Sequence, residues 1–157
     1  MSSEKTILIT GCSSGIGYAC AKMLKDRGWR VFATARKDAD IIRLEGEGFE
    51  VFRLDYTEPV TISECVAAVA ELFNNGAYGQ PGALEDISRA ALTAQFEANV
   101  FGWHELTRDC LKLMRANGQG RIVNNSSVLG LTAMKWRGAY CAAKFAVEAM
   151  SDTLRLE

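Results

Sequence analysis

A glycine-rich loop near the beginning of the chain does most to restrict what this sequence can fold into. Residues 10–17 read Thr-Gly-Cys-Ser-Ser-Gly-Ile-Gly, after the apolar run Thr6–Thr10 and at the start of a helical stretch from Gly15 to about Arg27. Glycines let a backbone turn sharply and approach a ligand, and a helix N-terminus offers free N–H groups with a partial positive charge. The loop favours a pyrophosphate-binding site, the alternative being a turn that serves only to reverse the chain.

Apolar strands alternate with helices through the first half of the chain. We predict strands over Arg30–Ala35 and Phe49–Leu54, a short helix over Ala39–Leu44 between them, and another helix beginning near Pro59. This alternation implies a parallel sheet with helices on both faces, a doubly wound Rossmann-like α/β fold. The 157 residues match the length of a single domain, residues 1–157.

The second half continues the same pattern. A long helical region is predicted from Ser88, a suitable N-cap residue, to about Ala116, because apolar side chains recur there at helical spacing. A glycine-containing break follows, then a strand over Arg121–Asn125, and an alanine-rich helix from Gly138 to the last residue, Glu157.

Charge, hydropathy and cysteine content exclude several classes of function. The chain has 18 Lys and Arg against 19 Asp and Glu, which argues against a nucleic-acid-binding surface. No apolar run approaches the roughly 18 residues that span a bilayer, and the first residues do not resemble a signal peptide, so we expect a cytoplasmic protein. The five cysteines form no C-x-x-C pair, and His104, the only histidine, is expected to be structural, so no disulfide framework or metal site is expected.

The end of the second predicted strand bears on the choice of cofactor. An acidic residue there binds the ribose of NAD, whereas an arginine accommodates the 2′-phosphate of NADP. This strand ends in Arg36 and Lys37, with no carboxylate, so NADP(H) is favoured over NAD(H). Two alternatives stay open: the two cations only solvate the strand end, or Asp38 or Asp40 reaches the ribose.

Three further features point to proton-transfer chemistry. Tyr140 and Lys144 are four residues apart on the last helix, so they share a face, and a neighbouring cation favours the phenolate of a tyrosine that acts as a general acid/base. Ser126 and Ser127 come directly after a strand, where ligands bind in open α/β folds. Asn99 is a polar residue on an apolar helical stripe, and its alternative role is a structural link to a neighbouring strand.

Together these motifs resemble the tyrosine-dependent short-chain dehydrogenase/reductase family. The resemblance covers essentially the whole chain, and the loop at residues 10–17 matches that family's cofactor loop throughout. Ser127 lies thirteen positions before Tyr140, which is the family's catalytic spacing. The single positions that match the family's pattern are Asp55 with Tyr56 beside it, Asn99, Ser127, Tyr140 and Lys144.

The resemblance implies an NADP(H)-dependent oxidoreductase that interconverts a carbonyl and an alcohol by hydride transfer. Tyr140 would transfer the proton, Ser127 would hydrogen-bond the reacting oxygen, and Lys144 would tune the tyrosine and hold the nicotinamide ribose. Asn99 would position a water in a proton relay behind Lys144. The residues implied to contact the cofactor are Gly11, Ser13, Ser14, Gly15, Ile16, Gly17, Arg36, Asp55, Tyr56, Asn75, Tyr140 and Lys144.

The same resemblance implies partners. The substrate would be a small-molecule alcohol or ketone, and the loop variant that contains Cys12 is similar to branches acting on lipophilic alcohols. The protein would be a homodimer or homotetramer paired through its long helices. The runner-up function is a non-catalytic NADP(H)-binding sensor or scaffold of the same fold.

The sequence departs from the family pattern in two places. The family's Asn-Asn-Ala-Gly is replaced by Asn-Asn-Gly-Ala at 74–77, and we expect Asn75 to keep its place near the cofactor. The stretch from Thr61 to Phe73 reads as one helix, so the loop and most of the fourth strand are expected to be missing near Phe73–Asn74. The family's C-terminal strands are missing after Glu157, so we hypothesise that the domain is incomplete.

Overall fold

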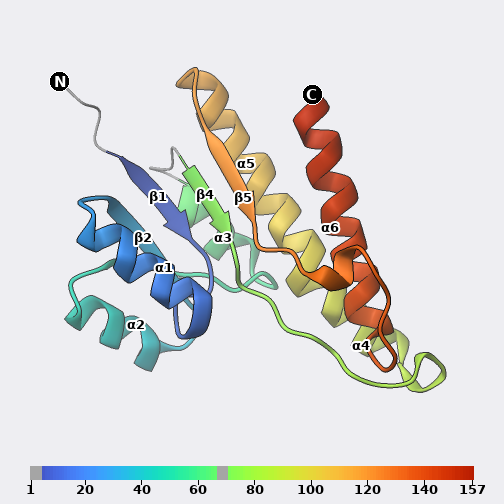
Figure 1. Ribbon diagram of the computed structural model, residues 1–157. Helices are drawn as coiled ribbons and strands as arrows, with labels where there is room; N and C mark the ends of the chain where they lie inside the picture. The colour runs from blue at the N-terminus through green and yellow to red at the C-terminus, as the bar shows by residue number, and fades with distance from the viewer. Residues whose placement is uncertain (1–4, 67–70) are drawn as a thin grey trace.

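Five parallel strands form one sheet in the computed structural model, which describes residues 5–66 and 71–157 (Figure 1). Their order across the sheet is β3-β2-β1-β4-β5, so the predicted doubly wound α/β fold is confirmed. The strands are β1 (Thr6–Ile9), β2 (Arg30–Ala35), β3 (Glu50–Arg53), β4 (Glu71–Asn74) and β5 (Arg121–Asn124). The helices are α1 (Gly15–Asp26), α2 (Asp38–Gly46), α3 (Pro59–Cys65), α4 (Arg89–Phe96), α5 (Gly102–Ala116) and α6 (Gly138–Leu156).

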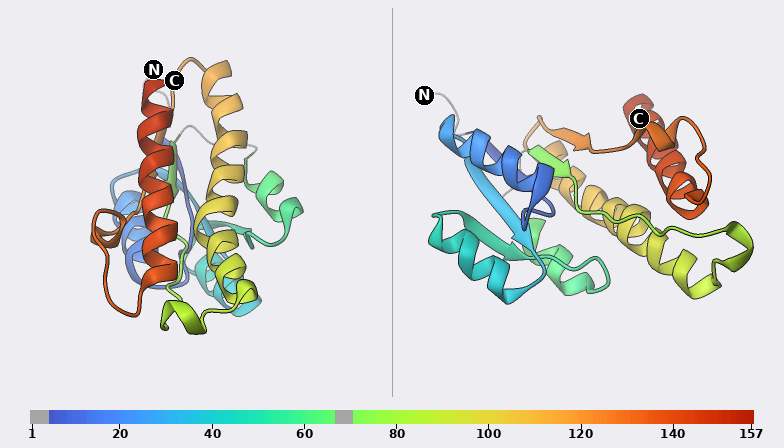
Figure 2. Two further views of the ribbon diagram at one scale, coloured as in Figure 1. Left: turned by 90° about the vertical axis from the view of Figure 1, so that its right-hand side faces the viewer. Right: turned by 60° about the horizontal axis from the view of Figure 1, so that its bottom comes forward.

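Helices cover both faces of the sheet because successive strand residues point to opposite sides. Ile7 and Ile9 of β1 pack with residues of α1 and α2 in one apolar cluster. Leu8, between them, packs with residues of α3 and α5 in a second cluster on the other face. Figure 2 shows α5 and α6 side by side, and residues of both line a groove of about 450 Å³ between them.

The fourth strand corrects one prediction. The expected single helix from Thr61 to Phe73 is wrong, because α3 ends at Cys65 and β4 occupies Glu71–Asn74. β4 pairs with β1 on one side and with β5 on the other. Leu72 belongs to one apolar cluster and Phe73 packs against the other, so both faces of β4 are covered. Burial of both faces therefore overrides a helix-like local pattern. Residues 67–70, which precede β4, lie outside the described residues, and the expected gap near Phe73–Asn74 stays a prediction.

The long second-half helix is interrupted. Ser88 caps α4 as predicted, and its hydroxyl accepts a hydrogen bond from the Ala91 N–H at 3.2 Å. Between α4 and α5 the chain makes a π-helical turn, η3 (Glu97–Phe101). Such turns insert one extra residue into a helix and often occur at functional sites. Short 3₁₀ turns lie in the connecting loops, among them η2 (Leu84–Asp86) and η4 (Val128–Gly130).

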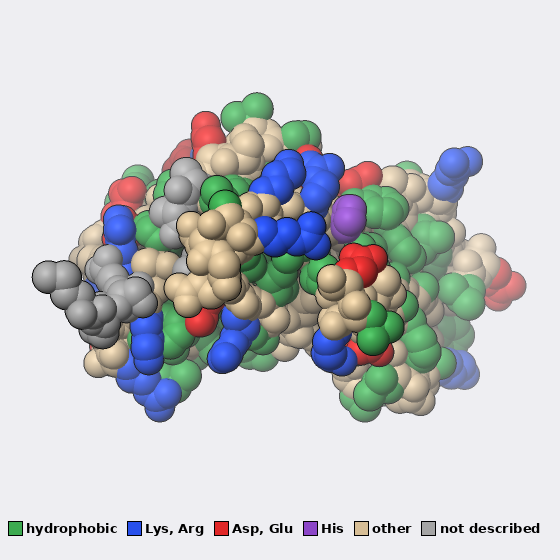
Figure 3. Space-filling model, turned by 90° about the horizontal axis from the view of Figure 1, so that it is seen from above, with side chains coloured by type: hydrophobic (Ala, Val, Ile, Leu, Met, Phe, Trp, Pro, Cys, Tyr) green, Lys and Arg blue, Asp and Glu red, His purple; other side chains and the backbone are tan. Residues whose placement is uncertain are grey.

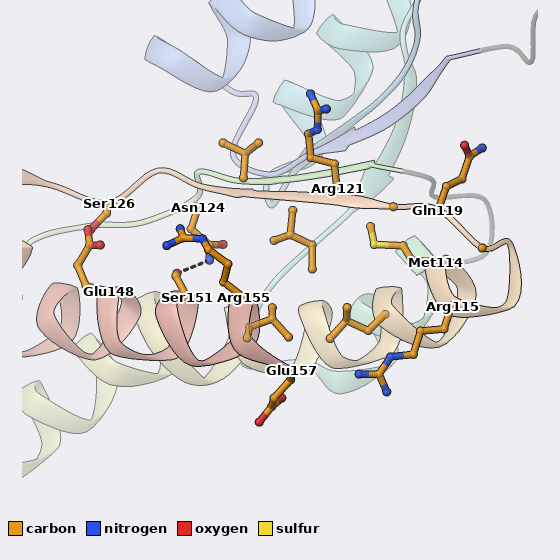
Figure 4. Close-up of a pocket in the computed structure, with 16 residues that line it drawn as sticks. Met114, Arg115, Gln119, Arg121, Asn124, Ser126, Glu148, Ser151, Arg155 and Glu157 are labelled. Carbon is orange, nitrogen blue, oxygen red and sulfur yellow. Dashed lines mark hydrogen bonds between the residues drawn. The ribbon is translucent and has the colours of Figure 1, made fainter.

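One edge of the sheet borders an open cleft. In the described part of the chain β5 pairs with β4 alone. A cleft of about 910 Å³ lies between β5 and the helices α5 and α6, where Asn124 donates a hydrogen bond to the Ser151 hydroxyl at 2.8 Å (Figure 4). None of the described helices combines the length and the apolar character needed to span a membrane.

Candidate functional site

The loop between β1 and α1 brings backbone close to backbone. Gly11 has φ +71°, and a Cβ added there would lie 2.7 Å from the Cα of Gly76. A Cβ at Gly17 would lie 2.6 Å from the Asn75 amide nitrogen and closer still to the Gly11 carbonyl oxygen. Ser14, the N-cap of α1, makes no side-chain capping bond to the first-turn N–H groups. The loop and the helix N-terminus together therefore have the properties of an anion-binding site.

A cavity of about 1190 Å³ extends from this loop along the carboxyl end of the sheet. Its walls come from the ends of β2, β3 and β4 and from α4. The predicted cofactor residues that line it are Gly11, Ser13, Ser14, Ile16, Arg36, Asp55, Tyr56 and Asn75. Gly15 and Gly17 belong to the same loop without lining the cavity, and Tyr140 and Lys144 lie outside its lining.

Charged groups flank this cavity at the ends of β2 and β3. Arg36 lines it, whereas the Asp38 carboxylate pairs with Arg53, which also donates a 2.7 Å hydrogen bond to the Arg36 carbonyl. Partial burial raises the pKa of Asp55, but hydrogen bonds from the Thr57 N–H and hydroxyl, together with the nearby arginines, lower that pKa overall. Asp55 therefore presents an ionised carboxylate to the cavity.

Asn75 ties the ends of three strands together. Its N–H donates to the Thr10 hydroxyl at 2.8 Å, and its side-chain amide donates to the Thr10 carbonyl at 3.1 Å. Asn125, beyond β5, donates to the Asn75 side-chain oxygen at 2.9 Å. The Gly76 N–H also reaches the Thr10 hydroxyl at 2.9 Å. Asn75 thus lies against the glycine-rich loop, and its side-chain amide group is hydrogen-bonded to other protein atoms.

Tyr140 and Lys144 lie on α6 in different surroundings. Lys144 is 1% exposed, and its ammonium donates to the Asn125 carbonyl at 2.9 Å. Burial lowers the pKa of Lys144 to about 8, while Glu148 acts in the opposite direction. Tyr140 is half-buried, and its ring centroid is 5.7 Å from the Lys144 ammonium. The pair therefore consists of a buried cation and a tyrosine that reaches the surface.

Ser127 lies at the start of η4, which packs on α6. Its hydroxyl oxygen accepts a hydrogen bond from the Leu129 N–H at 3.1 Å, which leaves the hydroxyl hydrogen available to donate. Ser127 does not line the large cavity at the glycine-rich loop. The neighbouring Ser126 hydroxyl is buried and has no hydrogen-bond partner among the described residues.

Asn99 belongs to a row of side chains that holds the segment after β4. Its amide oxygen accepts from the Tyr78 N–H at 3.2 Å, and its amide nitrogen donates to the Tyr78 carbonyl at 2.7 Å. One turn earlier, Gln95 donates to the same carbonyl at 2.8 Å and accepts from the Gln80 N–H at 2.6 Å. One turn later, the Trp103 indole donates to the Gly76 carbonyl at 2.8 Å. Asn99 therefore holds the backbone of the loop that follows β4, whereas the structural alternative considered from the sequence was a link to a neighbouring strand.

Gln95 and Trp103 were missed at the level of sequence. Both are buried, and with Asn99 they recur every four residues along one helical face. That spacing was a usable signal, because a row of side chains that can hydrogen-bond on an otherwise apolar face needs partners. The partners are backbone groups within residues 76–80, and the Asn-Asn-Gly-Ala motif at 74–77 does not reveal that these groups need partners.

A smaller cavity of about 390 Å³ adjoins the first. It is lined by Ala77, Tyr78, Gly79, Leu129, Met134, Arg137 and Tyr140. Ala77 and Tyr78 line both cavities. An elongated ligand anchored by its phosphates at the glycine-rich loop can therefore extend toward Tyr140, and a second small molecule has room beside that tyrosine.

The described residues contain no cluster of histidine, cysteine and carboxylate side chains suited to a metal ion. His104 is exposed (Figure 3), and it lines the groove between α5 and α6. Cys12 is a buried residue of the glycine-rich loop, and burial raises the pKa of its thiol to about 12. Neither side chain offers a reactive group to the two cavities.

Comparison with known proteins places the chain in a family. A family model described as short chain dehydrogenase matches residues 5–157. The chain is 44% identical to the uncharacterized oxidoreductase YbbO of Escherichia coli, over 98% of this chain and 60% of that protein. It is 35% identical to the 3-ketodihydrosphingosine reductase of Bacteroides thetaiotaomicron, over 96% of this chain and 57% of that protein. The chain thus spans about three fifths of the length of these relatives.

Solved structures agree with this result. A variant of actinorhodin polyketide ketoreductase with NADPH superposes with a TM-score of 0.90 at 29% identity. The match covers 99% of this chain and 66% of that chain.

Proposed function

This chain belongs to the short-chain dehydrogenase family, and from that premise we propose that it acts as an NADP(H)-dependent oxidoreductase on a carbonyl or alcohol substrate. One observation carries the proposal. The large cavity at the glycine-rich loop and the small cavity at Tyr140 share Ala77 and Tyr78 as lining residues. A dinucleotide in the first and a carbonyl compound in the second would meet beside a tyrosine.

The residues along the large cavity fit a nicotinamide dinucleotide. The N–H groups at the start of α1 would hold its pyrophosphate, because Gly11 and Gly17 leave no side chain in the way. The cofactor, when bound, supplies or accepts the hydride. We assign its contacts to Gly11, Ser13, Ser14, Gly15, Ile16, Gly17, Arg36, Asp55, Tyr56, Asn75, Tyr140 and Lys144.

Three observations support NADP(H) over NAD(H). Arg36 lines the cavity, so its guanidinium can pair with a 2′-phosphate. Asp38 pairs with Arg53 and Asp40 lies 3.9 Å from Arg43, and neither aspartate lines the cavity. A structural relative was solved with NADPH.

Four side chains of this protein have different roles in the proposed proton transfer. In the reducing direction Tyr140 donates its phenolic proton to the carbonyl oxygen, and Ser127 donates a hydrogen bond to that oxygen. The Lys144 ammonium stabilises the phenolate left behind, and it would hold the nicotinamide ribose of a bound cofactor. Asn99 fixes Tyr78 and supports a water relay behind Lys144.

The small cavity favours a lipophilic substrate. Leu129 and Met134 contribute apolar side chains to its lining, which also includes Arg137. The Bacteroides relative is named for a ketone of the sphingoid class, and we extend a lipophilic ketone or alcohol to this chain. The groove between α5 and α6 offers a surface for pairing with a second copy, so we propose a homodimer or homotetramer.

The test is a titration with NADPH and with NADH, followed by a panel of ketones and aldehydes. Wild-type protein is expected to bind NADPH at least about tenfold more tightly, because a charge-assisted pair contributes about 1.5–3 kcal/mol. Arg36→Leu loses this preference, whereas Lys37→Leu, which removes a neighbouring cation that does not line the cavity, keeps it. Equal affinities for both cofactors would contradict the assignment, and binding without turnover on any carbonyl would favour the sensor or scaffold.

A further inference from the structure

Lys144 is a buried cation that forms no ion pair with any residue that the structure describes. The residue is only 1% exposed, and its side chain is among the largest that are fully buried. Among the described residues its ammonium donates one hydrogen bond, to the neutral Asn125 carbonyl at 2.9 Å. An ammonium has three hydrogens to donate, so two face other groups. A buried charge in such surroundings needs another source of stabilisation.

The face of the Trp103 ring supplies it. The Lys144 ammonium lies 4.3 Å from the centroid of the Trp103 ring, closer than its 5.7 Å from the Tyr140 ring. Tryptophan has the most strongly attractive ring face for a cation, and the attraction grows when water is excluded. Trp103 is 3% exposed, so water is excluded on this side of Lys144.

The indole is itself fixed in place. Its Nε1–H donates to the Gly76 carbonyl at 2.8 Å, in the segment that also borders the large cavity. One turn earlier on the same face, the Asn99 side chain accepts a hydrogen bond from the Tyr78 N–H and donates one to the Tyr78 carbonyl. The Trp103 ring therefore has a fixed position relative to both the glycine-rich loop and α6.

We infer that Trp103 is a positioning residue that holds the Lys144 ammonium by its ring face and keeps it charged beside Tyr140. An aromatic ring suits this task because it attracts the cation yet cannot take its proton, whereas a carboxylate would bind the ammonium and cancel its charge. The inference rests on the proposed function only where it gives Lys144 a catalytic task. The interaction of the Trp103 ring with the Lys144 ammonium can be measured even if the protein shows no turnover.

The groups that act on Lys144 come from three elements. Glu148 and Tyr140 share α6 with it, the Asn125 carbonyl follows β5, and Trp103 lies on α5. Burial lowers the pKa of Lys144 and Glu148 raises it. Because the ring stabilises the charged form, removal of the ring lowers that pKa further.

The test is an NMR titration of the Lys144 side-chain carbon signals, assigned by their absence in Lys144→Met. Fluorinated tryptophans withdraw charge from the ring face and barely change its shape, so the fold is preserved. The pKa of Lys144 is expected to fall stepwise with each added fluorine. Lys135, an exposed lysine 4.7 Å from the Trp136 ring centroid, serves as the internal comparison and should move much less. A Lys144 pKa that is unchanged across the fluorinated series would overturn the inference.

Substitutions give an independent measurement. Trp103→Leu should lower the pKa of Lys144 by about 1, whereas Trp103→Phe, which keeps a ring but loses the bond to Gly76, should recover most of that loss. A purely structural role predicts the same Lys144 pKa in both variants, and that result would refute the inference. If the wild-type protein turns over a carbonyl, the pH profile of kcat should shift in the Leu variant and return in the Phe variant.

Discussion

Gly17→Ala tests whether the glycine-rich loop is as tightly built as its geometry indicates. The new methyl group would lie 2.6 Å from the Asn75 amide nitrogen and closer still to the Gly11 carbonyl oxygen. The Asn75 side chain can turn away only by losing its bonds to Thr10 and Gly11, and the Gly11 carbonyl is backbone that moves only with the loop. Overpacking of this kind costs about 1–3 kcal/mol, more than the roughly 1 kcal/mol that alanine gains over glycine in a helix.

The experiment measures two free energies, that of NADPH binding and that of unfolding. Because the shifted backbone carries the proposed pyrophosphate contacts, we expect NADPH to bind about 10–100-fold more weakly, with a free energy of unfolding up to about 2 kcal/mol lower in urea. Gly46→Ala is the matched control, since it also places alanine in a helix but has nothing within 4 Å of the new methyl group. That variant should match or exceed wild-type stability and bind NADPH equally well. Wild-type affinity and stability in Gly17→Ala would refute the account of the loop.

Two further predictions concern buried polar groups. Burial lowers the pKa of Lys144 from its usual 10.5 to about 8, so its charge reduces stability below pH 8, and this cost is relieved as the pH rises toward 10.5. Lys144→Met should therefore raise the free energy of unfolding by about 1–3 kcal/mol at pH 7 and by less at pH 10, and an equal gain at both values would contradict this. Gln95→Leu leaves the Gln80 N–H without its hydrogen-bond partner, whereas the Tyr78 carbonyl keeps its bond from Asn99. It should lower the free energy of unfolding by about 1–3 kcal/mol in urea, whereas Gln119→Leu, at an exposed position, should change it by less than about 0.5 kcal/mol.

Local features of the sequence predicted much of the fold. The run Arg30–Ala35 is β2 to the residue, because an apolar stretch bounded by polar residues has little choice of ends once both faces are buried. α1 begins at Gly15 and α6 at Gly138, as expected. Tyr140 and Lys144 share a face of α6 because a spacing of four residues fixes that face in any α-helix.

β4 could not be predicted in the same way. Its four residues become a strand because β1 and β5 lie on either side, and that pairing depends on residues far away in the sequence. The same limit applies to Asp38, whose partner Arg53 belongs to the neighbouring strand β3. The buried row of Gln95, Asn99 and Trp103 was visible as a spacing, but its partners are backbone groups, which no side-chain pattern reveals.

The most direct test of the central proposal is Tyr140→Phe, assayed for both NADPH binding and carbonyl reduction. The variant removes one hydroxyl, so the account predicts unchanged NADPH affinity and a turnover number at least about 100-fold lower, the usual share of a general acid. Tyr18→Phe, whose hydroxyl bonds Glu47 on the surface at 2.8 Å, controls for loss of a tyrosine hydroxyl and should retain wild-type turnover. Turnover in Tyr140→Phe within a few-fold of wild type would contradict the assignment of Tyr140 as the proton donor.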